Sequence, residues 1–182
     1  MKQFRALGLI GTLMLLWLPP STVAQQPRPS VPRLPSFELF DLSGRKQTLQ
    51  DLKGKGATLI NFFFPGCSAC NTEMPHLKAL YEKYRDQGFE LISINLLPEQ
   101  NGWIAEWAKR GGYSHPILKA PRSGGSLAQR YFVRSTPTNY LVDGDGWPVR
   151  RWRGYAPGNE KRMEKEIRQL LGLEAGEGGG RR

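Results

Sequence analysis

The residues of this sequence best suited to covalent chemistry are Cys67 and Cys70, the only two cysteines in a chain of 182 residues. Two residues separate them, a spacing that chance placement seldom produces. A disulfide between them would close so short a loop that it would add little stability by restricting the unfolded chain. The pair therefore predicts reversible thiol–disulfide chemistry, with an inert pair of small buried side chains as the alternative.

The chain around the cysteines predicts a strand, a tight turn and a helix. Residues 57–64 (ATLINFFF) are apolar and rich in β-branched and aromatic side chains, as expected for a central strand covered on both faces. Pro65 and Gly66 end this strand, and Cys67 follows in the first turn of the expected helix. Unpaired N–H groups and the helix dipole favour a thiolate there, and the thiolate is the form that attacks a disulfide. We therefore expect Cys67 to attack and Cys70, one turn later and more buried, to resolve the mixed disulfide.

A proline in a distant part of the chain is the candidate for substrate binding. Thr136 and Pro137 stand immediately before an expected hairpin strand. A cis bond at Pro137 would expose backbone groups beside the active sulfur, where an extended substrate chain could pair with them. The alternative is a trans proline in a turn, the form that most X–Pro bonds adopt.

The first 24 residues are predicted to form a secretory signal peptide. Lys2 and Arg5 precede an uncharged apolar run over residues 6–18, and small residues follow at 22–24. The run has 13 residues, fewer than the roughly 18 to 20 that cross a bilayer as a helix. We therefore expect cleavage and a periplasmic or otherwise extracytoplasmic protein, with an uncleaved membrane anchor as the alternative.

Composition divides the rest of the chain into three parts. Residues 25–33 are rich in proline and predict an extended linker, residues 34–171 predict one folded domain, and the glycine-rich residues 172–182 predict a disordered tail.

The net charge of +10 predicts a basic surface. Since its cations alternate with acidic and apolar residues, and an exported protein meets little nucleic acid, we expect a solvated face and no nucleic-acid partner.

Hydrophobic spacing and turn residues predict an α/β sandwich with a mixed central sheet flanked by helices. Strands are expected at residues 37–40, 47–49, 57–64, 89–97, 116–118, 139–142 and 149–153, and helices at residues 70–87, 103–110, 126–132 and 159–171. Residues 143–146 (DGDG) predict a hairpin turn between the last two strands.

These features together resemble a known family. The segments that carry the resemblance are LPSF at 34–37, DLKGKG at 51–56, NFFFPGCSAC at 61–70, EMP at 73–75 and TPT at 136–138. They are similar to extracytoplasmic thioredoxin-like disulfide reductases of the TlpA and ResA type, with the CcmG (DsbE) proteins of cytochrome c maturation as close relatives. The resemblance covers about residues 34–171. It implies a thioredoxin fold with an N-terminal strand extension, a redox-active Cys67–Cys70 disulfide with no other cofactor, and a cis bond at Pro137.

The resemblance also implies partners. Clients would be exported proteins such as apocytochrome c, and a membrane electron donor of the DsbD or CcdA type would restore the dithiol of a monomeric reductase. A thiol oxidase or isomerase with the same site is the alternative, because the dipeptide Ser68-Ala69 does not set the direction of electron flow.

Two departures from the family pattern bear on the mechanism. Gly66 stands where thioredoxins have tryptophan, so Cys67 is expected to be less shielded. Asn61 replaces the buried aspartate of cytosolic thioredoxin, as in ResA-type proteins, so another group must exchange a proton with Cys70. Glu99 is the candidate for this proton transfer, although ungapped alignment places Pro98 at the family position.

Metal binding is the alternative from a different class of function. The two cysteines with His76 and His115, the only histidines, could supply four ligands, and the protein would then be a periplasmic metal (copper)-binding or delivery protein. Their spacing fits no common zinc pattern, so no metal site is expected.

A peroxiredoxin is a further class that the sequence excludes. Its motif requires a threonine and a cysteine at fixed positions after a proline. Counted from Pro65, those positions hold Ala69 and Thr72.

Overall fold

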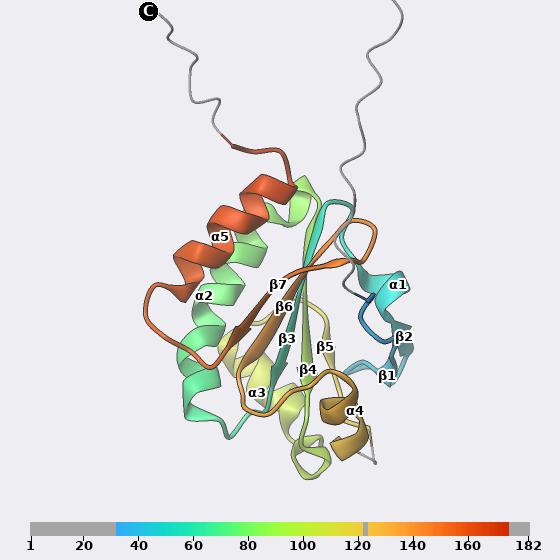
Figure 1. The fold of residues 1–182 in the computed structure, drawn as a ribbon. Helices are drawn as coiled ribbons and strands as arrows, with labels where there is room; N and C mark the ends of the chain where they lie inside the picture. The colour runs from blue at the N-terminus through green and yellow to red at the C-terminus, as the bar shows by residue number, and fades with distance from the viewer. Residues whose placement is uncertain (1–31, 122–123, 175–182) are drawn as a thin grey trace, which may run out of the picture. The chain divides into compact units, whose positions relative to one another are not determined.

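Five strands form the central sheet of the computed structural model, which describes residues 32–121 and 124–174 (Figure 1). Their order is β5-β4-β3-β6-β7, with bounds Ala57–Phe63 for β3, Phe89–Asn95 for β4, Ile117–Leu118 for β5, Thr138–Asp143 for β6 and Pro148–Arg153 for β7. β4 is parallel to β3 and β5, whereas β6 is antiparallel to β3 and β7. The sheet is therefore mixed, as the sequence predicts.

The central strand β3 is buried on both faces. Leu59 and Phe63 point into one core cluster, whereas Ile60 and Phe62 point into the other. Because both faces are covered, the sequence of this strand is a nearly continuous apolar run. Thr58 and Asn61 are its polar exceptions, and Asn61 is fully buried on the same side as Leu59.

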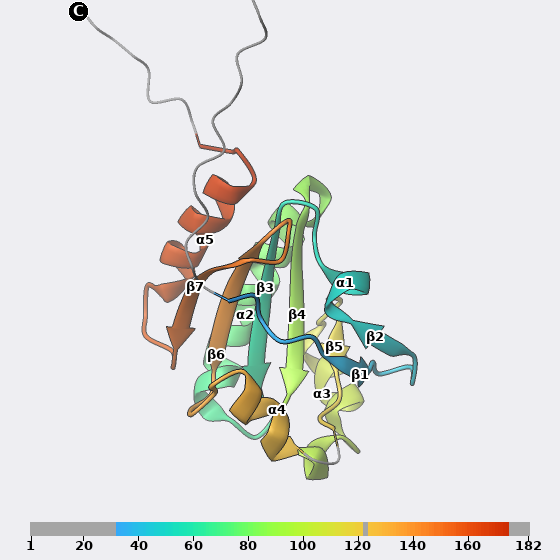
Figure 2. The same cartoon turned by 45° about the vertical axis from the view of Figure 1, so that its right-hand side comes forward.

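Helices cover both faces of this sheet (Figures 1 and 2). One face carries α2 (Ser68–Tyr84), α3 (Ile104–Gly111) and α5 (Asn159–Leu170); the other carries α4 (Gly124–Arg130) and the N-terminal segment. Short 3-10 helices, η1 (Arg85–Gln87) and η2 (Pro98–Gln100), follow α2 and β4. This arrangement confirms the predicted α/β sandwich.

The N-terminal extension is a two-stranded sheet followed by a short helix. β1 (Glu38–Phe40) pairs antiparallel with β2 (Lys46–Thr48), and α1 (Leu49–Leu52) follows directly. α1 was not predicted from the sequence, and Leu49, predicted as the end of the second strand, is the first residue of this helix. A capping box starts the helix: the Thr48 hydroxyl accepts from the Asp51 N–H, and the Asp51 carboxylate accepts from the Thr48 N–H.

The C-terminal boundary predicted at Leu171 is too early. Gly172 adopts a φ of +68°, and the N–H of Leu173 donates to the oxygen of Arg168 at 2.9 Å. Leu173 thereby packs against the core, so the prediction of a disordered tail from Gly172 onward is wrong for these two residues. The remainder of that tail from residue 175, the predicted signal peptide and the linker as far as residue 31 lie outside the described residues. Within the described ranges, no helix is long and apolar enough to cross a membrane.

Candidate active site

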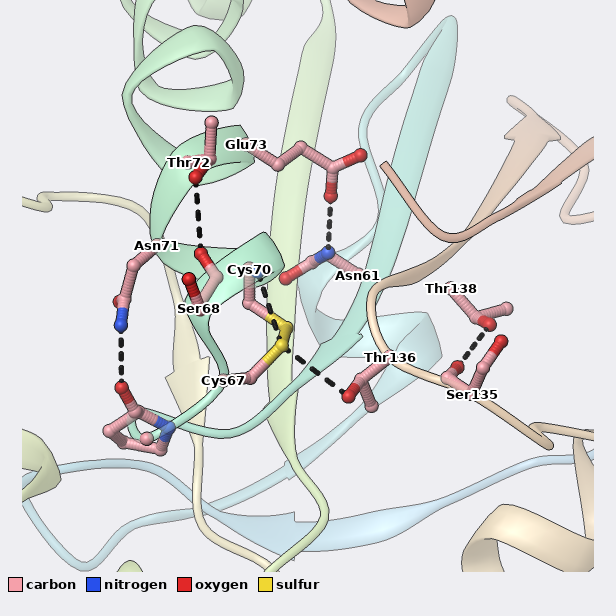
Figure 3. The surroundings of a disulfide bond; sticks show 12 residues. Asn61, Cys67, Ser68, Cys70, Asn71, Thr72, Glu73, Ser135, Thr136 and Thr138 are labelled. Carbon is pink, nitrogen blue, oxygen red and sulfur yellow. Dashed lines mark hydrogen bonds between the residues drawn. A yellow bond between two sulfur atoms is a disulfide. The ribbon is translucent and has the colours of Figure 1, made fainter. Parts of the chain in front are cut away.

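A disulfide joins Cys67 to Cys70 just after β3 (Figure 3). Cys67 is the N-cap residue of α2, and its sulfur accepts a 3.1 Å hydrogen bond from the N–H of Cys70. Cys67 is 7% exposed and Cys70 is 1% exposed, so Cys70 is the more buried of the two, as predicted. In the dithiol state, the same N–H group would stabilise a thiolate on Cys67.

Asn71 fixes the turn that precedes the first cysteine. Its side-chain amide donates a 2.8 Å hydrogen bond to the backbone oxygen of Pro65 (Figure 3). Its side-chain oxygen accepts a 3.0 Å bond from the indole N–H of Trp107 on α3. The turn is thus tied to two helices, which limits the movement of Cys67.

Thr136 and Pro137 lie beside the disulfide, although they are distant in sequence. The peptide bond between them is cis, as the family resemblance implies. The Thr136 hydroxyl donates to the Cys67 sulfur at 3.5 Å (Figure 3). The Pro137 oxygen accepts a 2.7 Å bond from the N–H of Gly154. Neither backbone polar group of Thr136 is hydrogen-bonded within the part of the chain that the structure describes. An extended substrate chain could pair with these groups next to Cys67.

An apolar cavity of about 430 Å³ opens beside Thr136. Loops after β3 and β4, together with α4 and the segment before β6, line it with Phe64, Leu96, Leu97, Pro98, Ala128, Val133, Arg134, Ser135 and Thr136. Because Thr136 also contacts the Cys67 sulfur, this residue lies between the cavity and the disulfide.

A buried carboxyl group shares the helix with the disulfide. Glu73 follows Cys70 by three residues, which places both on one face of α2, and it is 2% exposed. The register of β3 and β6 pairs Asn61 with Asn139. The Asn139 amide donates to both carboxyl oxygens of Glu73 at 3.0 Å. The Asn61 amide donates to one of them at 3.3 Å (Figure 3). Three side chains from α2, β3 and β6 therefore form one buried polar cluster.

Burial raises the pKa of Glu73 from 4.5 to about 7. Hydrogen bonding from Asn139 opposes this rise, and the negative charge of Glu160 on α5 adds to it. A carboxyl group with a pKa near neutrality can take up and release a proton at physiological pH. The position of Glu73 therefore suits proton exchange with a buried thiol.

Glu73 is not among the residues predicted for the site, although its spacing carried a signal. The buried face of α2 repeats every three or four residues through Cys70, Met74, Leu77 and Leu80. Glu73 falls on the same face, where a charged side chain is unexpected. This exception to the apolar pattern indicated a buried carboxyl group.

Glu99, the residue predicted for proton transfer, is exposed on η2. It forms no hydrogen bond or ion pair with any residue in 32–121 or 124–174. Its neighbour Gln100 reaches the active site instead, where its side-chain oxygen accepts a 2.9 Å bond from the N–H of Gly66. A Cβ atom at Gly66 would lie 3.2 Å from the amide nitrogen of Gln100. Gln100 therefore shields the side of the turn that the glycine was expected to leave open.

The two histidines lie apart from the cysteines. His76 is exposed and stacks on Tyr155, with ring centroids 6.0 Å apart. His115 is buried, and its Nε2 lies 2.9 Å from the hydroxyl of Ser93. Among the residues that the structure describes, no three side chains of His, Cys, Asp or Glu are grouped to hold a metal ion. These residues therefore do not form the arrangement that the four-ligand alternative requires.

Comparison with known proteins identifies the family. The AhpC/TSA family model matches residues 32–147. The thiol-disulfide oxidoreductase ResA of Bacillus thuringiensis subsp. konkukian is 35% identical over 136 residues, 75% of each chain. The chain belongs to the AhpC/TSA family, with the ResA-type thiol–disulfide oxidoreductases as relatives. The chain is therefore a thiol–disulfide oxidoreductase, and its structure contains a disulfide between Cys67 and Cys70.

Solved structures agree with the ResA-type fold. A Chlorobium tepidum protein with the name thiol:disulfide interchange protein DsbE has a TM-score of 0.69 at 23% identity, over 76% of this chain and 95% of that one. The thioredoxin domain of a thiol-disulfide oxidoreductase from Bacteroides vulgatus has a TM-score of 0.64 at 24% identity, over 75% and 96%. The fold is therefore thioredoxin-like.

Proposed function

We propose that this ResA-type protein works outside the cytoplasm and reduces disulfides of exported client proteins. The observation that carries the proposal is the position of Cys67, which lies at the N-cap of α2 and beside the Thr136–Pro137 cis bond. The N-cap favours the attacking thiolate, and the cis bond leaves the backbone of Thr136 free for a client. The redox-active disulfide is the only cofactor that this chemistry requires.

The reaction begins with the dithiol form of the protein. The Cys67 thiolate attacks one sulfur of the client disulfide, forms a mixed disulfide and releases the first client thiolate, which takes a proton. The Cys70 thiolate then attacks the Cys67 sulfur and releases the second client thiolate. Two electrons pass to the client, and the Cys67–Cys70 disulfide of the structure remains.

Glu73 is the group that we propose to accept the proton of Cys70. It shares a buried helical face with that cysteine, and its pKa of about 7 lies close to that of a thiol in exchange chemistry. Glu99, the residue predicted from the sequence for proton transfer, is exposed and has no hydrogen-bond partner in the described chain. Burial and position both favour Glu73.

The apolar cavity beside Thr136 supports binding of an extended client chain. Pairing with the backbone of Thr136 would hold the client along the cis-proline segment. A residue adjacent to the client cysteine could then bury an apolar side chain between Leu97 and Val133.

The proposed function also includes an electron donor, a client and a location for the protein. Because an extracytoplasmic compartment is oxidising, an electron donor of the DsbD or CcdA type would restore the dithiol. Reduction of haem-site cysteines in apocytochrome c is the sharpest form of the proposal, and the resemblance to ResA-type and DsbE-type proteins supports it. We propose a monomeric protein exported by a cleaved signal.

The test is capture of clients in cells. Cys70→Ser removes the resolving sulfur, so we expect mixed disulfides between Cys67 and exported proteins to accumulate on non-reducing gels. Cys67→Ser, expressed at the same level, is the matched control and should capture none. Absence of trapped clients with Cys70→Ser would overturn the proposal.

The reduction potential tests the direction of electron flow. Equilibration with glutathione buffers and thiol labelling would measure the Cys67–Cys70 potential. A value near −270 mV, about that of thioredoxin, is expected for a reductant, whereas a value near −120 mV would identify an oxidase.

A further inference from the structure

A second apolar cavity, of about 590 Å³, lies on the sheet face that also carries α4. The N-terminal segment, the end of α4 and the strands β6 and β7 line it with Pro32, Leu34, Pro35, Tyr131, Phe132, Tyr140, Pro148 and Val149, and with four arginines. Phe132 and Val149 are exposed large apolar side chains, at 68% and 44%. Exposed apolar surface around a cavity is typical of a binding site.

Arginine side chains surround this cavity: Arg33, Arg130, Arg150 and Arg151. Arg150 is paired with Glu166 on α5, with 2.8 Å between its Nε and a carboxylate oxygen. Arg151 instead donates to the hydroxyl of Tyr140 at 3.0 Å. In the chain that the structure describes, three of the four guanidinium groups have no carboxylate partner. The cavity therefore combines an apolar lining with an unneutralised positive rim, to which carboxylates are complementary.

Phe132 adopts a backbone conformation that favours glycine. Its φ is +51°, and its N–H donates to the oxygen of Gln129, in the pattern that ends a helix with a left-handed residue. α5 ends in the same pattern with Gly172 at this position, and α3 ends with Gly112 at a φ of +61°. At the end of α4, a bulky side chain takes the left-handed position and projects into solvent. Fold stability does not explain this choice, whereas a contact surface does.

The open edge of β7 adjoins the same cavity. β7 is the last strand of the sheet and pairs only with β6 among the described strands. Its outer edge therefore presents backbone groups to which another extended chain could add as a strand. Val149 and Arg151 of β7 line the cavity, so an added strand would lie against the arginine rim.

We propose that this cavity and the edge of β7 form a docking site for an acidic segment of a client protein, in extended conformation and with apolar residues between its carboxylates. The proposal rests on the function proposed above. Arginines would bind the carboxylates, Phe132 and Val149 would pack on the apolar side chains, and β7 would pair with the backbone. The N-terminal 31 residues of the chain itself carry no Asp or Glu and lack this complementarity.

The shape of the site favours a peptide over an anionic membrane. A lipid surface would meet a flat or convex array of cations, whereas here the cations surround a cavity large enough for side chains. The planar arginine fork also matches a carboxylate group in two hydrogen bonds.

The docking site lies within reach of the active site. Phe132 lines the arginine-rimmed cavity, and residues 133–136 line the apolar cavity beside Thr136. The four residues that follow Phe132 in the chain span at most about 14 Å. A client held at β7 would therefore bring a neighbouring disulfide to the reactive sulfur.

Binding to the oxidised protein tests the docking site without thiol exchange. The probe is a fluorescent peptide of alternating glutamate and valine that matches the six residues of β7 in length. We expect saturable binding that weakens with salt, and weaker binding by at least about tenfold when lysine replaces glutamate. Equal binding of both peptides would overturn the proposal, as would binding to phosphatidylserine vesicles without binding to the acidic peptide.

Two variants localise the site. Arg151→Glu should weaken binding of the acidic peptide by about tenfold, whereas Arg110→Glu, an equal charge change on the exposed side of α3, should leave it unchanged. Phe132→Gly should weaken binding by about fivefold while the melting temperature stays equal or rises, because glycine suits the left-handed position. Unchanged binding by both cavity variants would overturn the proposal.

Kinetics separate this inference from the proposed function. Reduced protein should reduce a disulfide peptide with the acidic extension about tenfold faster, in kcat/KM, than one with a neutral extension, and Arg151→Glu should remove the difference. Equal rates on both peptides would overturn the docking site and leave the reductase function intact. Failure to reduce either peptide would overturn the reductase function, and peptide binding would still decide the docking site.

Discussion

A comparison of Glu73 with Glu90 shows that an altered pKa does not by itself mark a functional group. Burial raises the pKa of both Glu73 and Glu90 to about 7. Glu73 accepts hydrogen bonds from two asparagines and shares a helical face with Cys70. Glu90 accepts one hydrogen bond, from the N–H of Leu91, and lines a cavity of about 480 Å³ with tyrosines from α2 and the loop after α3.

Position distinguishes the two carboxyl groups. Cys67 follows the carboxyl end of β3, where Phe63 pairs with Asn95 of β4. Glu90 lies near the opposite end of β4, five residues or about 17 Å from Asn95 along the strand. Desolvation therefore raises the pKa of both groups, but of the two only Glu73 shares a buried helical face with Cys70.

The largest expected effect is on the pH dependence of stability. The pKa of Glu73 in the folded protein lies above its ordinary value of 4.5, so its protonated form stabilises the fold. That contribution is complete below pH 4.5 and is lost as the pH rises through about 7, and a rise of this size corresponds to at most about 3 kcal/mol. Glu73→Gln should remove this pH dependence from the free energy of unfolding, measured by urea denaturation of the oxidised protein.

Glu90→Gln is the matched variant for the stability experiment. It should change the pH profile in the same direction but by less, because Glu90 is only partly buried. If the free energy of unfolding depends on pH in the same way in Glu73→Gln and in the wild-type protein, Glu73 does not titrate in this range.

The next effect concerns the resolving step. Glu73→Gln removes the proposed proton acceptor, so the mixed disulfide should persist about tenfold to a hundredfold longer, and the rate should lose its inflection near pH 7. Stopped-flow measurement of client release would check this prediction. Glu90→Gln should release the client at the wild-type rate; an equal slowing in both variants would refute the distinction between the two carboxyl groups.

The smallest effect is expected at the attacking sulfur. Thr136→Val keeps the shape of the side chain and removes the hydroxyl that donates to Cys67, which should raise the pKa of the thiol and slow the attack by about threefold at neutral pH. Thiol labelling across a pH series would measure the change. Thr72→Val is the control, because the Thr72 hydroxyl bonds to the Ser68 oxygen and not to sulfur. A labelling rate that follows the wild type in both variants would mean that the hydroxyl does not stabilise the thiolate.

Local patterns predicted most of the fold, and non-local packing accounts for the misses. The apolar run of β3 and the turn at residues 143–146 carry their signals within a few residues, and the structure has both. The short helix α1 was missed because its capping box spans only Thr48 to Asp51. Gln100 was missed because its contact with Gly66 joins two loops that are distant in sequence.

The sequence by itself determined that the two sulfur atoms proposed to react lie together, because two cysteines one helical turn apart at the start of a helix form a local arrangement. It also placed the cis-proline segment among the candidates, through the family resemblance. Only the tertiary structure distinguishes Glu73 as the carboxyl group that we propose for proton transfer. The environment of Glu73 depends on Asn61 and Asn139, which the pairing of β3 with β6 brings together beneath α2. A burial that depends on three separate elements cannot be assigned from the spacing of residues along one of them.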